Sequence, residues 1–292
     1  MGASEPVVVV NQSSGTALVP EEARRLFPGA VLVDCETEDV PARLGELVPQ
    51  RPPFVAVAGG DGTQRMVAAC LVETGVPLLP VPTGTLNHFA RQLGIETVDD
   101  AEAAGKGSVT REVDIAEVNG EVFVNTSSLG QYPAFVRNRD DAKERAPKAL
   151  ATAVAAWRQL TRNHRLDVGV DGTRYHAWLV FIGNNRYGVD PGDVGERDEL
   201  TAGVLDVRVL RADRRFARLR AVIALLLGRV GRSRLLVRSE SAAAELAVAG
   251  DAAGRVGGVE VALDGEVLRL TSPLRYRMRP GALTVQVPEP RV

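Results

Sequence analysis

The sequence predicts two domains, an α/β domain followed by a mainly antiparallel β domain. In residues 1–112, short runs of β-branched and other apolar residues alternate with stretches of helical character, as in parallel sheets with helices on both faces. Beyond Glu112, pairs of alternating segments flank Asn-Gly and Asp-Gly dipeptides, which are the strongest short-range signal of a β-hairpin. The length of 292 residues is sufficient for two domains.

The first part contains four expected strands and three expected helices. The strands are continuous apolar runs, typical of a buried parallel sheet, at 7–10, 30–35, 54–59 and from 76 onward. The helices are expected from about Pro20, at 41–48 and at 64–74. Since strands and helices alternate, the connections are expected to be right-handed crossovers.

The second part is expected to consist mainly of β-hairpins. Their turns are predicted at Asn119-Gly120, Asp171-Gly172 and Asp264-Gly265. Two segments with helical character, at 147–162 and 213–229, interrupt the strands. The change of pattern near Glu112 therefore marks the expected domain boundary.

Composition excludes several classes of protein. Hydrophobic residues at 45% and charged residues at 25% are ordinary for a globular protein, which excludes disordered and collagen-like chains. Cys35 and Cys70 are too few for a disulfide framework, and no signal peptide is recognisable. The longest strongly apolar run, 221–227, is far shorter than the ~20 residues of a membrane-spanning helix. We expect a cytoplasmic protein without a transmembrane segment.

The net charge of −2 is unevenly distributed along the chain. Residues 1–112 contain 8 basic and 15 acidic residues, and the remainder contains 27 basic and 22 acidic residues. The basic second part indicates either an anionic partner, such as a membrane surface, or an ordinary solvated surface. Nucleic acid is not an expected partner, because only 4% of the residues are aromatic and no base-stacking module is recognisable.

The segment from Gly59 to Thr63, GGDGT, lies between an expected strand and an expected helix. Its three glycines allow backbone N–H groups to approach a phosphate, and a helix N-terminus favours negative charge. Asp61 would repel a phosphate unless a cation such as Mg²⁺ bridges the two. The alternative is a tight turn in which Asp61 is the N-cap of the helix.

A second glycine-containing segment, 82–91, follows the next expected strand. Thr83, Thr85 and Asn87 carry hydroxyl or amide groups that suit a phosphate or a hydroxyl ligand. Loops at the carboxyl ends of parallel strands line a common crevice, so both glycine segments are able to face one ligand. Each of these polar residues also suits a helix cap, and that alternative stays open.

Four segments in order, GGDGT, PTGTLNHFARQLGI, FVNTSSLG and LDGE, resemble the diacylglycerol kinase catalytic family of lipid kinases. The resemblance implies a nucleotide-binding α/β domain of the NAD kinase/phosphofructokinase-like fold at 1–112, followed by a β-sandwich lipid-substrate domain at 113–292. It implies an ATP-dependent enzyme that transfers the γ-phosphate to a hydroxyl of diacylglycerol or a similar lipid. Two alternatives stay open: a soluble metabolite kinase of the NAD type, and a catalytically impaired nucleotide- or lipid-binding protein.

The resemblance also implies roles for individual residues. Glu266 would accept the proton of the lipid hydroxyl, with Asp61 as a second catalytic residue. Asp61 and Asp114 would belong to an Asp, water and Mg²⁺ network. Asn125, Ser127 and Ser128 would contact the lipid substrate. The implied ATP contacts are Asn11, Thr37, Gly59, Gly60, Asp61, Gly62, Thr63, Gln64, Arg65, Gly84, Thr85 and Asn87.

Three residues depart from the family pattern. Arg65 stands where many relatives have Asn, and His88 where many have Asp. Ala202 replaces the usual Asp of an accessory metal site, so that site is expected to be weakened.

The resemblance further implies partners and a location. The lipid substrate would be met at a membrane surface, placing the protein at the inner face of the membrane, and similar bacterial kinases suggest a homodimer. Ten arginines between Arg208 and Arg238, with an apolar stripe at helical spacing, fit an interfacial helix. Alternatively, the stripe packs against the β domain.

Overall fold

A computed structural model describes the chain at 5–13, 18–85, 87–107, 109–130, 166–188, 197, 199–213, 233, 235–249 and 258–289. The predicted helix at 147–162, and that at 213–229 apart from Asp213, lie outside these residues. The chain divides into two compact units. The first unit comprises 1–115, 121–125 and 279–292, and the second comprises 116–120 and 126–278.

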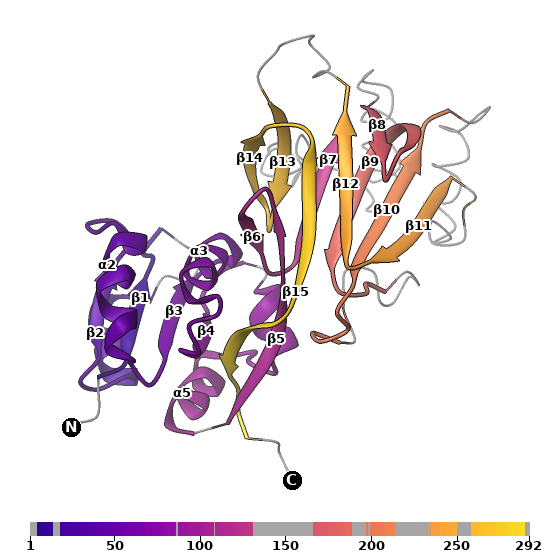
Figure 1. The fold of residues 1–292 in the computed structure, drawn as a ribbon. Helices are drawn as coiled ribbons and strands as arrows, with labels where there is room; N and C mark the ends of the chain where they lie inside the picture. Colours follow the sequence, from indigo (N-terminus) through magenta and orange to yellow (C-terminus); the bar gives the residue numbers. More distant parts are fainter. Residues whose placement is uncertain are drawn as a thin grey trace, which may run out of the picture. The chain divides into compact units, whose positions relative to one another are not determined.

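The first unit contains a parallel sheet (Figure 1). Its strands lie in the order β2-β1-β3-β4, and Val285 of β15 pairs in parallel with Leu78 of β4. The strands are β1 (Val7–Val10), β2 (Val31–Asp34), β3 (Val55–Gly59), β4 (Leu78–Pro82) and β15 (Leu274–Gln286). All residues of β1 and β3 are buried, as expected for parallel strands with both faces covered.

Helices pack on these strands. The three predicted helices are confirmed as α1, α2 and α3, whereas two further helices, α4 and α5, were not predicted. The α2 helix is followed by a short 3₁₀ turn, η1. The bounds are α1 (Pro20–Leu26), α2 (Val40–Leu47), η1 (Val48–Gln50), α3 (Asp61–Leu71), α4 (His88–Gln92) and α5 (Val98–Lys106). No helix within the described ranges is long and apolar enough to cross a membrane.

The second unit is mainly antiparallel. Its principal strand order is β14-β13-β7-β9-β8-β12-β15, with β10 paired to β9 and to β11. Two further strands precede β7 in the chain and pair with each other: β5, which runs from the first unit into the second, and β6, which belongs to the first unit. The bounds are β5 (Thr110–Val118), β6 (Glu121–Phe123), β7 (Thr126–Gly130), β8 (Leu166–Val170), β9 (Thr173–Asn184), β10 (Leu205–Arg211), β11 (Leu236–Ser241), β12 (Ala243–Val248), β13 (Val259–Leu263) and β14 (Glu266–Leu270).

All three predicted hairpin turns are confirmed. Both residues of each turn have positive φ: 50° and 90° at Asn119-Gly120, 47° and 80° at Asp171-Gly172, and 49° and 93° at Asp264-Gly265. Two consecutive left-handed residues are the requirement of a type I′ turn, whose twist matches that of the flanking strands. The dipeptides therefore fix the local register of the hairpins.

Candidate functional site

In the parallel sheet of the first unit, the direction in which successive strands are added reverses, which creates a switch point between β1 and β3. The chain moves from β1 to β2 on one side of β1, whereas β3 and β4 lie on its other side. Ligands of open α/β sheets bind at the carboxyl ends of the strands at such a switch point. Asn11 follows β1 and Gly60 follows β3, so two of the predicted residues lie at this point.

The loop after β1 is bonded to the helix after β3. Asn11 Nδ2 donates to Thr63 Oγ1 at 2.8 Å, and the Asn11 backbone N–H donates to the Ala58 carbonyl at 2.9 Å. Gln12 Nε2 also donates to Asp34 Oδ2 at 2.9 Å, which connects this loop to the turn after β2. Thr37 is exposed in that turn. The loops after the three strands thus form one connected edge.

The first glycine loop packs tightly onto α3. A Cβ atom on Gly59 would lie 2.6 Å from Thr63 Cβ, so the strand can approach the helix this closely only with glycine. Gly60 is the N-cap and Asp61 is the first helical residue, so the alternative in which Asp61 caps the helix is wrong. Gln64 Nε2 donates to the Gly59 carbonyl at 3.1 Å. The loop is therefore held from both ends.

The second glycine loop contacts the first. A Cβ atom on Gly84 would lie 2.6 Å from Gly60 Cα, which shows how closely the two backbones approach. Asn87 stabilises the second loop, since its Oδ1 accepts from the Gly84 N–H at 2.8 Å and its Nδ2 donates to the Gly84 carbonyl at 2.7 Å. Thr83 is buried, and its Oγ1 has no hydrogen-bond partner within the described ranges, whereas Thr85 is exposed.

Asp61 connects the two loops electrostatically. Burial raises the pKa of Asp61, and the charge of His88 together with hydrogen bonds from the Phe89 and His88 backbone N–H groups opposes that rise. Asp61 Oδ1 is buried, and no group in the described part of the chain forms a hydrogen bond with it. A desolvated carboxylate oxygen without a protein partner is suited to a ligand that supplies positive charge.

The arrangement fits a nucleotide phosphate. Two glycine backbones in contact and the N-terminus of the 11-residue helix α3 form a cradle that side chains would fill. Asp61 Oδ1 offers one oxygen to Mg²⁺, which is commonly held by one or two carboxylates together with substrate phosphates. Within the described ranges, no three His, Cys, Asp or Glu side chains gather closely enough to hold a metal ion alone.

The other predicted acidic and basic residues of the first unit have structural partners. Asp114 is 4% exposed, and its Oδ1 accepts from the Gly281 N–H at 2.9 Å. Arg65 is buried, and its Nη1 donates to the Val122 carbonyl at 3.4 Å and lies 3.7 Å from a Glu121 oxygen. These contacts connect β5 to β15 and α3 to β6.

In the second unit, Glu266 is the first residue of β14 and is exposed. It follows the Asp264-Gly265 turn and pairs with Leu263 across the hairpin. Asp264 Oδ1 accepts from the Thr126 N–H at 2.8 Å, and the Asp264 N–H donates to the Thr126 carbonyl at 2.9 Å. The turn before Glu266 is therefore anchored to the start of β7.

The predicted lipid contacts lie at and before β7. Asn125 is buried in the first unit. In the second unit, the hydroxyls of Ser127 and Tyr276 are 2.9 Å apart, and burial raises the pKa of Tyr276 well above its usual value. Ser128 Oγ is buried, and none of the described residues forms a hydrogen bond with it. Ser127 and Ser128 pair with Leu263 and Ala262 of β13, next to the hairpin that carries Glu266.

The segment of the expected accessory metal site contains Asp206. Asp206 Oδ2 accepts from the Tyr187 N–H at 3.1 Å and pairs with Arg208 at 2.5 Å. Ala202 stands where the family's accessory metal site usually has Asp. In the described part of the chain, the Asp206 carboxylate instead binds the Tyr187 N–H and Arg208.

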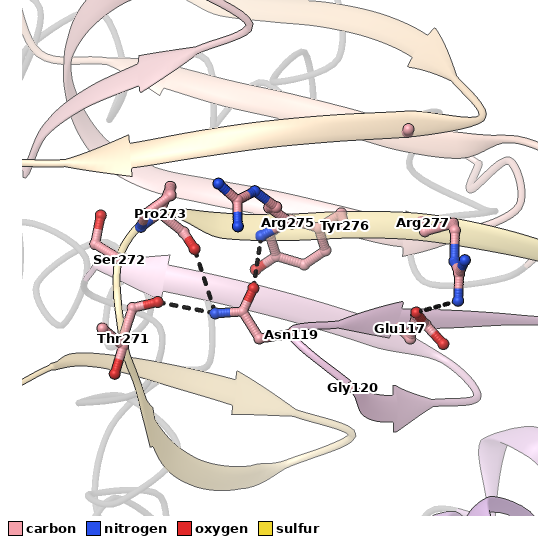
Figure 2. A pocket seen from close by; sticks show the side chains of 10 residues that line it. Glu117, Asn119, Gly120, Thr271, Ser272, Pro273, Arg275, Tyr276 and Arg277 are labelled. Carbon is pink, nitrogen blue, oxygen red and sulfur yellow. Dashed lines mark hydrogen bonds and ion pairs between the residues drawn. The ribbon is translucent and has the colours of Figure 1, made fainter.

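A cavity of about 660 Å³ in the second unit is lined by none of the predicted residues (Figure 2). Asn119 Nδ2 donates to the Thr271 and Pro273 carbonyls at 2.8 and 3.3 Å, and its Oδ1 accepts from the Arg275 N–H at 2.8 Å. Arg277 pairs with Glu117 at 2.7 Å. These contacts fasten the Asn119-Gly120 hairpin to β15.

Sequence reasoning missed a buried polar group at the end of β9, where Arg197 Nη1 donates to the Asn184 carbonyl. It contains Arg197, Asn184 and Asn185, which are 7%, 1% and 0% exposed. None of them lies in a motif or at a regular spacing, and only their burial in the fold makes them recognisable.

Comparisons with known proteins agree with this architecture. The diacylglycerol kinase catalytic domain matches residues 5–118, and the YegS C-terminal NAD kinase β-sandwich-like domain matches 128–287. A "Probable lipid kinase YegS-like" of Pseudomonas fluorescens is 30% identical over 79% of this chain and 76% of its own length. A protein of the same description from Pseudomonas aeruginosa is 30% identical, with coverages of 89% and 84%.

Solved structures show the same fold. A diacylglycerol kinase from Bacillus anthracis is 18% identical, with a TM-score of 0.64 and 98% of each chain covered. Another structure from that organism has a TM-score of 0.68 at 21% identity, with 99% of each chain covered. The two matching domains and the 30% identical relatives together establish that the chain belongs to the diacylglycerol kinase catalytic-domain family, in its YegS-like group.

Proposed function

We propose that the chain is an ATP-dependent lipid kinase that transfers the γ-phosphate of ATP to a hydroxyl of diacylglycerol or a similar lipid. The observation that supports this most directly is the contact between the two glycine loops at the switch point of the sheet, next to the partly unsatisfied Asp61. The named relatives are described as lipid kinases, which agrees with the proposal.

In the first unit, the chain would bind and orient the nucleotide. Backbone N–H groups from Gly60 to Thr63 would bind the phosphates, while Asn11 and Asn87 hold the two loops in place. Asp61 would orient the bound cation through its Oδ1. When bound, Mg-ATP supplies the phosphoryl group and neutralises charge on the phosphate oxygens.

In the second unit, Glu266 would accept the proton of the lipid hydroxyl. Its carboxylate is exposed at the end of a fixed turn, as a proton acceptor for an incoming substrate must be. Ser127 and Ser128 lie on the neighbouring strand, where they and Asn125 would contact the lipid headgroup.

The proposal includes the surroundings of the enzyme. The lipid would be met at a membrane surface, with the arginine-rich part of the chain contributing attraction to anionic headgroups. The homodimer suggested by the resemblance also belongs to the proposal, and sedimentation of the purified protein tests it.

The test is transfer of labelled phosphate from Mg-ATP to diacylglycerol, ceramide, sphingosine, monoacylglycerol and phosphatidylglycerol in mixed micelles, and to NAD. We expect product on a lipid.

Glu266→Gln should lower that transfer at least about a thousandfold with ATP still bound, because the variant cannot accept the proton. Glu260→Gln, in the other strand of the same hairpin, is the matched control and should transfer phosphate at the normal rate. Product on NAD alone would establish the metabolite kinase instead. No product on any acceptor, with ATP bound, would indicate a binding protein.

A further inference from the structure

The turn before Glu266 is bonded to a third strand through the side chain of Asp264. The Asp264 backbone N–H donates to the Thr126 carbonyl at 2.9 Å, and Asp264 Oδ1 accepts from the Thr126 N–H at 2.8 Å. Facing residues of an antiparallel ladder exchange two such bonds between their backbones. Here the carboxylate oxygen takes the place of one backbone carbonyl. The pairing of β13 with β7, in which Leu263 faces Ser127, is therefore extended by one residue into the turn.

The same pair of bonds recurs at the other two hairpin turns of the second unit. The Asp171 N–H donates to the Glu245 carbonyl at 3.0 Å, and Asp171 Oδ1 accepts from the Glu245 N–H at 2.9 Å. Asn119 forms the equivalent bonds with the backbone of Arg275 at 3.1 and 2.8 Å (Figure 2). Since asparagine and aspartate both form this contact, it depends on an Oδ1 acceptor at a left-handed residue and not on a negative charge.

The Asp264 turn differs from the other two in the residue that follows it. Glu266 begins β14, and among the described strands β14 pairs with β13 alone, at the end of the strand order. A strand held by one neighbour is placed less firmly than a strand inside a sheet. The bond between Asp264 and Thr126 adds a second attachment, which connects the start of β14 to the start of β7.

We propose that Asp264 is a positioning residue for Glu266: its Oδ1 docks the turn onto Thr126 and so fixes the Glu266 carboxylate relative to β7. The inference rests on the proposed function, because it takes Glu266 as the proton acceptor. Asp264 is 9% exposed and acts through the turn. A displacement of about 1 Å at a reacting group can cost about a hundredfold in rate.

The experiment compares the steady-state kinetics of Asp264→Gly and Asp264→Asn on the lipid phosphorylated by the wild type. Glycine removes the acceptor without straining the left-handed backbone, whereas asparagine keeps an Oδ1. Asp264→Gly should lower kcat at least about tenfold, and Asp264→Asn should stay within about twofold of the wild type. The KM for ATP should stay within about twofold in both, since the nucleotide loops belong to the other unit.

Two kinetic results would overturn the proposal. A wild-type kcat in Asp264→Gly would show that Glu266 is placed without the bond to Thr126. An Asp264→Asn variant as slow as Asp264→Gly would assign the effect to the negative charge of Asp264 and not to the docked turn.

Asp171→Gly is the matched control, because Asp171 makes the same two bonds and has the same left-handed backbone. The residues that follow it have no part in the proposed function. Asp171→Gly and Asp264→Gly should each unfold about 2–4 °C below the wild type, as expected for the loss of one hydrogen bond. Only Asp264→Gly should lose kcat. Equal losses of kcat in the two variants would indicate general destabilisation and would overturn the positioning role.

A second pair of variants serves if Asp264→Gly does not fold. In Asp264→Ser and Asp171→Ser the side-chain oxygen lies one bond closer to the backbone, so the contact with the neighbouring strand is weakened. We expect kcat to fall at least about threefold in Asp264→Ser and to stay at the wild-type value in Asp171→Ser. Equal kcat values in the two serine variants would contradict the proposal.

Amide hydrogen exchange of Thr126 separates this inference from the proposed function. Asp264 Oδ1 protects the Thr126 N–H in the wild type, so exchange should be at least about tenfold faster in Asp264→Gly and nearly unchanged in Asp264→Asn. If the wild type phosphorylates no lipid, the proposed function fails, and faster exchange still supports Asp264 as the residue that docks the turn. Unchanged exchange in Asp264→Gly would overturn that role whatever the activity.

Discussion

At the scale of single residues, Asp61 shows a conflict between the proposed site and the stability of the fold. Its carboxylate is desolvated, and its Oδ1 has no hydrogen-bond partner among the residues that the structure describes. Such an arrangement is unfavourable in the folded protein alone and becomes favourable when a cation is bound. Residues of this kind are expected where function, and not packing, determines the side chain.

Asp61→Asn should therefore stabilise the protein at neutral pH. Because the pKa of Asp61 is raised in the folded state, the folded protein binds this proton more tightly than the unfolded chain, and ionisation destabilises the fold as pH rises above about 3.9. An asparagine side chain does not ionise, so it does not destabilise the fold in this way as pH rises. We expect a higher Tm at pH 7 to 8, a difference that fades as pH falls toward about 4, and impaired use of Mg-ATP.

Thermal melts across this pH range are the measurement. Asp39→Asn is the control, because Asp39 is an exposed N-cap of α2 and asparagine caps equally well. A Tm of Asp61→Asn below that of the wild type at pH 7 would mean that the hydrogen bonds from His88 and Phe89 outweigh desolvation.

The Ser127 and Tyr276 hydroxyls give a second residue-scale prediction. Both residues are buried, at 0% and 2% exposed, and their oxygens are 2.9 Å apart. Tyr276→Phe should lower the free energy of unfolding by about 1–3 kcal/mol, because Ser127 Oγ loses a partner that water cannot replace. Adding Ser127→Ala to Tyr276→Phe should lower the free energy of unfolding by less than Ser127→Ala lowers it in the wild type. Urea unfolding of the four proteins measures this coupling, and simple additivity would contradict it.

At the scale of elements, the sequence predicted most of the local structure. The apolar runs at 7–10 and 54–59 became buried strands, and the three X-Gly dipeptides became type I′ turns, because both patterns are decided by neighbouring residues. Sequence also indicated that the two glycine loops are able to face one ligand, but not that their backbones contact each other. The sequence did not predict that the Asn87 side chain hydrogen-bonds to Gly84 in its own loop. An asparagine at this place can bond either to its own loop or to the start of the following helix, and the local sequence does not decide between the two.

The contact between the glycine loops can be tested with Gly84→Ala. The new Cβ would lie 2.6 Å from Gly60 Cα and 2.8 Å from Asn87 Oδ1, so the loops must separate. We expect a loss of about 1–3 kcal/mol in stability, as for other overpacked positions, and a loss of Mg-ATP affinity of at least about tenfold by calorimetry. Gly45→Ala, with nothing within 4 Å of the added Cβ, is the control and should keep both properties. Unchanged affinity in Gly84→Ala would remove the loop contact from the proposed site.

At the scale of the whole molecule, the connectivity could not be derived from local patterns. The first unit is assembled from three stretches of the chain, and β5 and β15 contribute residues to both units. Nothing in the local sequence pattern indicates that Val285 pairs with Leu78, far away in the sequence. Similarly, Arg197 is recognisable as a buried residue bonded to Asn184 only after the fold has brought the two segments together.

This connectivity predicts that residues 1–118 do not fold alone. A chain ending at Val118 lacks four fully buried residues of the first unit, Phe123, Val124, Leu283 and Val285, each 0% exposed. Burial of each such side chain is worth about 1.5–3 kcal/mol, and a whole domain has a net stability of only about 5–15 kcal/mol. Loss of all four should therefore remove most or all of that stability. The matched control ends at Val287, which keeps β15 complete and should unfold at the same temperature as the full chain. Circular dichroism melts and amide dispersion by NMR distinguish the two, and a cooperative transition of the 1–118 chain would show that its own strands and helices suffice.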